Sequence, residues 1–141
     1  VHWSEVELHE ITTTWKSIDK HSLGAKALAR MFIVYPWTTR YFGNLKEFTA
    51  CSYGVKEHAK KVTGALGVAV THLGDVKSQF TDLSKKHAEE LHVDVESFKL
   101  LAKCFVVELG ILLKDKFAPQ TQAIWEKYFG VVVDAISKEY H

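Results

Sequence analysis

Eight histidines are the side chains of this sequence best suited to binding a metal, and two of them stand out by position. His58 lies three residues after Val55 and four before Val62, on an apolar stripe with helical spacing. His87 belongs to a second apolar stripe that spans about 80–91. An imidazole on an apolar face needs a polar partner, and for a single histidine that partner is most often a backbone carbonyl in the core.

Two such histidines on neighbouring helices favour a shared binding site over two separate hydrogen-bonded histidines in the core. They could face each other across an apolar slot, and a flat, largely apolar macrocycle that carries iron fits such a slot. One imidazole would bind the metal, and the other would stand over its open position. Zinc is poorly supported, because the sequence has no HExxH motif and no two histidines four residues apart.

Other chemistries and partners find little support. The sequence has no GxSxG elbow, no GxGxxG motif and no P-loop. Cys51 and Cys104 form no CxxC motif and predict two reduced thiols. With 18 Lys and Arg against 17 Asp and Glu, the chain is not a strongly basic nucleic-acid binder. No apolar run is long enough to span a membrane, and the first residues show no secretion signal.

The elements that position these histidines are predicted to be helices. Only 2 Pro and 8 Gly occur, too few for the turns of a β-sandwich. Apolar stripes with helical spacing predict one all-α domain over 1–141, with six or seven helices. Pro36 ends the second helix, and a turn-rich stretch follows to about residue 50. The main helices are expected at about 4–18, 19–34, 52–73, 80–90, 94–113 and 119–138.

Four strings give the chain a specific resemblance: VYPWTTRYF (34–42), VKEHAKKV (55–62), LSKKHAEELHVD (83–94) and the terminal KEYH. They resemble the β chains of vertebrate haemoglobins, in the globin family, along the whole sequence, and the departures point away from mammals. The chain is shortened between Phe42 and Val55, where β chains usually carry a further short helix. The resemblance implies a globin fold of seven or eight helices around haem b (iron protoporphyrin IX).

The same resemblance implies a role for individual residues. His87 would be the proximal ligand of the iron, and His58 would donate a hydrogen bond to bound oxygen. Val62 would crowd the ligand site, Phe42 would wedge the haem, and Lys61 would reach a haem propionate. The remaining pocket residues would be Leu66, Leu83, Leu91, Val93, Phe98, Leu101 and Ile136.

Assembly is implied in the same way. The chain would form a tetramer of two α and two β chains in the cytoplasm of red blood cells. The residues that match the tight dimer contact are Arg30, Tyr35, Phe117, Pro119 and Gln122. The residues that match the sliding contact are Pro36, Trp37, Arg40, His92 and Asp94.

Two regulatory sites complete what the resemblance implies. An organic phosphate such as ATP would bind a basic cleft between paired β chains, formed by Val1, His2, Lys77 and Lys138. His141 would pair with Glu89, and a carboxylate partner raises the pKa of a histidine. If that pair forms only in the low-affinity state, acid stabilises this state and lowers oxygen affinity, which is the Bohr effect.

The predicted function is reversible oxygen binding and transport, without enzymatic activity. A globin acting as a peroxidase or nitric-oxide dioxygenase is an alternative, but turnover needs a reductase partner or a distal charge, and no Arg lies near residue 58. A helical interaction module without a cofactor is the second alternative, which composition alone permits. Haem binding separates this module from the other two functions, and reversible oxygenation without net oxidation separates carrier from enzyme.

Overall fold

The computed structural model describes residues 1–87 and 94–138, and this part of the chain is all-α. It contains seven α-helices and three short 3₁₀ helices, without a strand. No helix in the described ranges combines the length and the apolar character needed to span a membrane. The elements in chain order are α1 (Glu5–Ser17), α2 (Lys20–Val34), η1 (Pro36–Phe42), α3 (Tyr53–Thr71), η2 (Leu73–Asp75), α4 (Val76–Gln79), α5 (Thr81–Lys85), α6 (Val95–Leu113), η4 (Lys114–Lys116) and α7 (Pro119–Ser137).

Local capping interactions explain where the long helices begin. Ser4 forms a capping box with Glu7 at the start of α1. Asp19 accepts a hydrogen bond from the amide of Ser22 at the start of α2, and Asp94 caps α6 in a similar way. These caps confirm the helix starts that the sequence predicts. The described residues between η1 and α3 form no helix, which agrees with the expected shortening.

Two details of the predicted helices are wrong. The helix expected at about 80–90 begins at Thr81 as α5, but a further short helix, α4, precedes it, and Phe80 between the two leaves the helical region while its ring is buried. The apolar residues of α1 at helical spacing predict one buried stripe, but Val6 and Leu8 at its start are 61% and 37% exposed. The buried residues of α1 lie further along, at Ile11 and Trp15.

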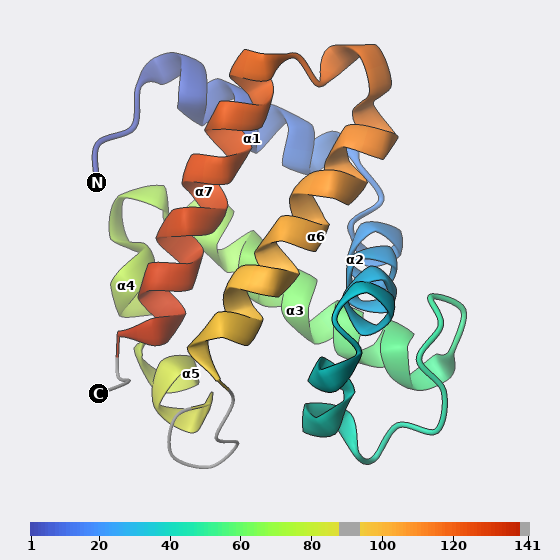
Figure 1. Cartoon of the computed structure of the whole chain (residues 1–141). Coiled ribbons are helices and arrows are strands. Elements are labelled where there is room, and N and C mark those ends of the chain that lie inside the picture. Colours follow the sequence, from blue (N-terminus) through green and yellow to red (C-terminus); the bar gives the residue numbers. More distant parts are fainter. Residues whose placement is uncertain (88–93, 139–141) are drawn as a thin grey trace.

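The helices pack as crossed layers (Figure 1). α6 and α7 run side by side in the view, and α3 crosses behind them. α2 packs against both α3 and α6. α2 and α3 approach closely at Gly24, where an added Cβ atom would lie 2.7 Å from Cγ2 of Thr63. A side chain at this position would therefore push the two helices apart.

Large aromatic side chains fill the core where α7 meets α1, α3 and α6. Trp125 and Tyr128 are fully buried, and Phe129 stacks on Phe105 of α6. The polar atoms of these two side chains, Tyr128 and Trp125, have partners. The Tyr128 hydroxyl donates to the carbonyl of Leu66 at 2.7 Å, and the Trp125 indole donates to Glu10. This region is therefore a closed, fully bonded core.

Candidate functional site

A cavity of about 430 Å³ lies among α3, α5, α6 and α7. Its size is within the usual range for a site that holds a small molecule or cofactor. Most of its wall is apolar, formed by Met31, Phe42, Val62, Ala65, Leu66, Phe80, Leu83, Phe98, Leu101, Ala102, Phe105, Phe129, Val132, Val133 and Ile136. The polar lining residues are Tyr41, Asn44, His58, Lys61, Lys86, His87 and Ser97.

His58 enters the cavity from α3. Its ring packs edge-on against Phe42, with the ring centroids 4.8 Å apart and the planes at 82°. Burial lowers the pKa of His58, and the charges of Lys61 and His87 lower it further. The imidazole is therefore neutral at physiological pH and carries one N–H donor and one lone pair.

His87 follows α5 on another wall of the same cavity. Its Nδ1 atom lies 2.8 Å from the carbonyl oxygen of Leu83. Because a carbonyl oxygen can only accept, Nδ1 carries the proton and Nε2 carries the lone pair. Histidines that bind metals usually donate their other ring nitrogen in this way. The Phe98 ring contacts the imidazole edge-on at 5.3 Å.

Four polar side chains lie among the lining residues besides the histidines and Tyr41: Lys61, Lys86, Asn44 and Ser97. Two exposed ammonium groups on an otherwise apolar cavity suit a ligand with an apolar body and anionic groups at one edge. Lys61 was predicted. Lys86 and Asn44 were not, and the only available signal was the position of Lys86 directly before His87.

The residues of this cavity fit haem b. The cavity offers apolar walls for a flat ring and a lone-pair nitrogen on His87 for iron. It also offers a neutral imidazole on His58 and two cations for the haem carboxylates. No group of three or more His, Cys, Asp or Glu in the described residues could hold a bare metal ion.

Ten residues predicted for this site line the one cavity, and two lie outside the described residues, Leu91 and Val93. The ten are Phe42, His58, Lys61, Val62, Leu66, Leu83, His87, Phe98, Leu101 and Ile136. They come from five segments far apart in the sequence, so their convergence depends on the fold. Sequence periodicity did not single out Tyr41 and Ser97 as cavity residues, although they line it as well.

The predicted contact residues occupy the surface around α2, η1 and the start of α7. Arg30 forms an ion pair with Glu108 at 2.5 Å, and Tyr35 packs edge-on against Trp37, which is 55% exposed. Phe117 packs close to Gly110. Each remaining contact residue that the structure describes sits at a helix end or a short helix: Pro36, Arg40, Asp94, Pro119 and Gln122. His92 lies outside the described residues.

The predicted regulatory residues are only partly described. Val1, His2, Lys77 and Lys138 belong to the described ranges, and Val1 is 81% exposed. Glu89 and His141 both lie outside these ranges.

The two cysteines are free, as predicted. Cys51 is exposed and Cys104 is buried. Burial raises the pKa of the Cys104 thiol to about 11, so this group is a thiol at physiological pH.

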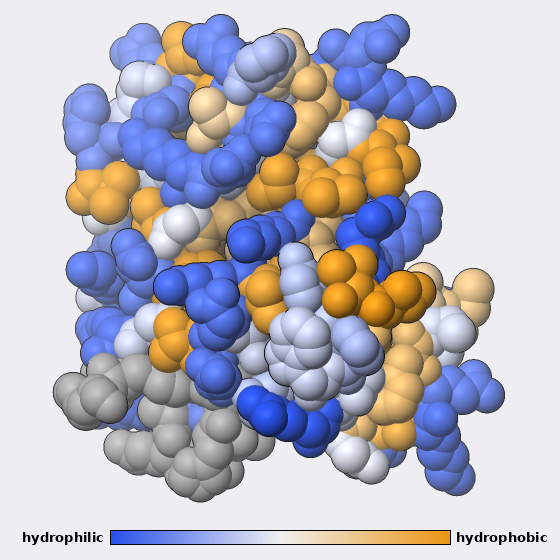
Figure 2. Space-filling model, in the orientation of Figure 1, coloured by the Kyte–Doolittle hydropathy of each residue, from blue (hydrophilic) through white to orange (hydrophobic). Residues whose placement is uncertain are grey.

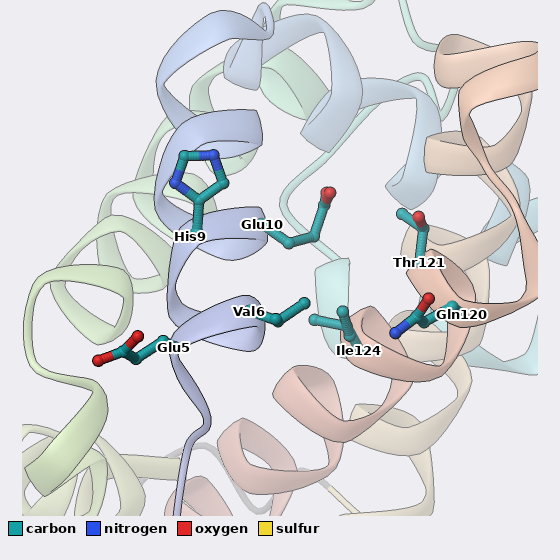
Figure 3. Close-up of a pocket in the computed structure, with 7 residues that line it drawn as sticks. All are labelled: Glu5, Val6, His9, Glu10, Gln120, Thr121 and Ile124. Atoms are coloured by element: carbon teal, nitrogen blue, oxygen red, sulfur yellow. The ribbon is translucent and has the colours of Figure 1, made fainter.

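A second hollow lies between the first turns of α1 and α7 (Figure 3). In this view Val6 and Glu10 extend toward Thr121 and Ile124, whereas Glu5 points away. The Glu10 carboxylate already accepts hydrogen bonds from Thr14 and Trp125. This hollow lacks the two imidazoles and the apolar enclosure that distinguish the larger cavity.

Residues 25–136 match the family model described as Globin. The chain belongs to the globin family. As a globin it has the expected all-α globin fold and carries haem b. This confirms the fold and the cofactor that the resemblance implies.

Among known proteins, this globin is 52% identical to haemoglobin subunit β of Mustelus griseus over 141 residues, with 100% of this chain and 99% of that one covered. It is 46% identical to haemoglobin subunit β-3 of Aquarana catesbeiana over 146 residues, with the same coverage. These relatives confirm the resemblance to β chains of non-mammalian vertebrates.

Solved structures agree. The deoxy form of haemoglobin from Dasyatis akajei superposes with a TM-score of 0.95 at 45% identity, with 100% of both chains covered. The deoxy form from Mustelus griseus gives a TM-score of 0.92 at 52% identity, again with 100% of both chains covered.

Proposed function

We propose that this globin binds oxygen reversibly and transports it as the β subunit of a haemoglobin tetramer with two α chains. The observation that carries the proposal is the pair His58 and His87 in one apolar cavity of a chain with full-length similarity to haemoglobin β subunits. The chain is a carrier and not an enzyme. All of residues 1–141 form a single globin domain in this proposal, because the buried core extends from Trp3 to Ala135.

Haem, when bound, would supply the ferrous iron that reversible oxygen binding needs. His87 would hold the iron through Nε2, and the hydrogen bond from Nδ1 to the Leu83 carbonyl fixes the ring orientation and the tautomer. His58 is neutral, so its N–H group can donate to a polar ligand in the cavity.

The walls of the cavity protect this chemistry. Phe42 packs against His58 and Val62 lines the same cavity, and apolar walls of this kind would disfavour water beside a ferrous iron. Lys61 and Lys86 provide charges for the haem carboxylates. Among the described residues, no arginine lines the cavity. An arginine therefore does not provide the strong charge near His58 that the enzyme alternative would use.

An exposed apolar surface supports assembly with α chains. Figure 2 shows apolar side chains gathered over α6 and the end of α2. Its exposed large members are Ile33, Val34, Val107, Ile111 and Leu112. The Arg30–Glu108 ion pair joins these two helices, and an apolar patch bordered by polar groups is typical of a protein interface. We assign the tight dimer contact to this surface and the sliding contact to η1 and the start of α6.

Regulation and location are further parts of the proposal. An organic phosphate binds between paired β chains at Val1, His2, Lys77 and Lys138, and the tetramer works in the red-cell cytoplasm. The phosphate site is tested with Lys77→Ala in the tetramer. We expect a weaker effect of ATP on oxygen affinity, and an unchanged effect would contradict the site.

The proton-linked pair of Glu89 and His141 is tested separately. Removing His141 should reduce the fall in oxygen affinity on acidification. A variant with an unaltered pH dependence would rule out this residue as a contributor.

The oxygen-binding proposal is tested by the visible absorption spectrum of the purified chain, recorded reduced and without oxygen, then with oxygen, then after oxygen removal. We expect a five-coordinate ferrous spectrum that converts reversibly to a stable oxygenated one. Absence of a haem band would refute the proposal. Rapid net oxidation in the chain assembled with α subunits would favour the enzyme alternative.

A further inference from the structure

Tyr41 belongs both to the cavity wall and to a hydrogen-bonded cluster at the start of α6. Its side chain lines the cavity. Its hydroxyl oxygen accepts hydrogen bonds from Nη2 of Arg40 at 2.9 Å and from the backbone N–H of Asp94 at 3.3 Å. Ser97, in the first turn of α6, also acts to lower the pKa of this phenol. One phenol oxygen thus joins η1 to the first turn of α6, across 53 residues of sequence.

The charge environment of Tyr41 suits this acceptor role. Burial acts to raise the pKa of the phenol, but the hydrogen bonds from Arg40, Ser97 and the Asp94 backbone outweigh burial and leave this pKa below its usual value. The guanidinium of Arg40 also lies 5.0 Å from the centre of the Tyr41 ring. The cation holds both the ring and its oxygen in place.

The contact at Asp94 fixes the point where α6 begins. The Asp94 side chain accepts a hydrogen bond from the amide of Glu96 at 3.0 Å and caps the helix. Its backbone N–H points to Tyr41. Asp94 is therefore fixed by two hydrogen bonds. Its backbone N–H donates to Tyr41 in η1, and its carboxylate accepts from Glu96 in the first turn of α6.

The first turn of α6 carries a residue that touches the proximal histidine. Phe98 follows Ser97 directly, and its ring packs edge-on against His87 with centroids 5.3 Å apart. A shift in the start of α6 would move Phe98, and the imidazole of His87 would lose a packing contact that fixes its orientation. A continuous chain of contacts therefore leads from Tyr41 through Asp94, Ser97 and Phe98 to His87.

We propose that Tyr41 is a positioning residue for His87, acting through the start of α6 and the ring of Phe98. The proposal rests on the proposed function only in taking His87 as the iron ligand. The hydrogen bond from the Asp94 N–H to the Tyr41 hydroxyl, the clamp, forms between residues of the polypeptide alone and needs no cofactor.

The clamp is tested by Tyr41→Phe, which removes one oxygen atom and keeps the ring in the cavity wall. The matched control is Tyr53→Phe, because the Tyr53 hydroxyl contacts Glu57 on the exposed side of α3. Amide hydrogen exchange is measured by NMR on the haem-loaded, carbon monoxide-bound chain. We expect the Asp94 amide to exchange about three- to tenfold faster in Tyr41→Phe and at the wild-type rate in the control. Unchanged exchange would overturn the clamp.

The positioning role is tested by resonance Raman spectroscopy of the deoxygenated chain, which reports the iron–histidine stretching band. We expect this band to shift in Tyr41→Phe and to stay in place in Tyr53→Phe. Faster Asp94 exchange without a band shift would overturn the positioning of His87. If the chain takes up no haem, the proposed function fails, while exchange in the haem-free chain still decides whether the clamp exists.

Discussion

The two halves of α7 differ in what they build from apolar residues. Toward its start, Trp125 and Tyr128 fill the space between helices, and their polar atoms bond to Glu10 and Leu66. Toward its end, the smaller Val132 and Val133 line an open cavity together with Ile136. The same helix therefore belongs to the core at one end and to the cavity wall at the other, and Phe129 between them contributes to both.

The boundary between core and cavity runs through Leu66 of α3. Its backbone carbonyl accepts the Tyr128 hydrogen bond, while its side chain lines the cavity. Wall atoms that face empty space lack the dispersion contacts that core atoms make. The cavity is thus stabilised when a ligand fills it, whereas the aromatic half is complete without one.

Trp125→Ala is the change with the largest expected effect, because it removes a fully buried side chain from the filled half. We expect the free energy of unfolding to fall by about 3–5 kcal/mol, measured by denaturant titration. Trp37→Ala, at an exposed position, is the control and should change it by less than about 0.5 kcal/mol in the isolated chain. If both variants lost a similar free energy of unfolding, the filled half of α7 would not have the stabilising role assigned to it.

His87→Ala acts on the cavity half. We expect haem affinity to fall about 100-fold or more, since even outer-shell partners of a metal ligand contribute 10–100-fold. Haem transfer to an acceptor protein measures this loss, and added free imidazole should restore part of the affinity. His72→Ala replaces an exposed histidine and should retain haem. Wild-type haem retention in His87→Ala would show that another side chain holds the iron.

His58→Leu should leave haem in place and accelerate oxygen release. The loss of one hydrogen bond of about 1.4 kcal/mol corresponds to about tenfold, measured by stopped-flow spectroscopy. Carbon monoxide, a less polar ligand, provides the internal control and should respond less. Equal changes for both ligands would indicate altered access to the cavity instead of a lost hydrogen bond.

The smallest expected effect is on the pH dependence of the haem-free chain. Burial, Lys61 and His87 hold the pKa of His58 below its ordinary value of 6.5. The unfolded chain therefore binds a proton at His58 more readily than the folded chain, so stability falls as pH drops below about 6.5. His58→Leu should flatten this decline in urea titrations at several pH values. Parallel profiles for both proteins would assign the decline to other groups.

The sequence predicted the long helices and the two imidazoles because both depend on helical periodicity. His58 and His87 share a face with apolar neighbours, and this signal is local. Val6 has the same local signal, yet it is exposed. An apolar stripe predicts which face of a helix can be buried, but burial also needs a neighbouring helix that packs against that face. Here the partner, α7, leaves a hollow beside Val6 and Ile124 (Figure 3).

The cavity residues that sequence reasoning missed depend on tertiary placement. Lys86 is polar and exposed, so nothing in its type indicates a cavity wall. The link from Tyr41 to Asp94 joins residues far apart in the chain, and only the packing of η1 against the start of α6 brings them together. The break between α4 and α5 falls at Phe80, where no glycine or proline marks it in the sequence.

The first residues of the chain are anchored at two points. The Trp3 indole donates to the carbonyl of Leu73 at 2.8 Å, and the Lys127 ammonium binds the His2 carbonyl at 2.7 Å. Two residues of chain reach about 7 Å, so the backbone at Val1 stays close to these anchors. A dye or spin label placed at position 1 would therefore serve as a nearly fixed reference point for distance measurements across the assembled protein.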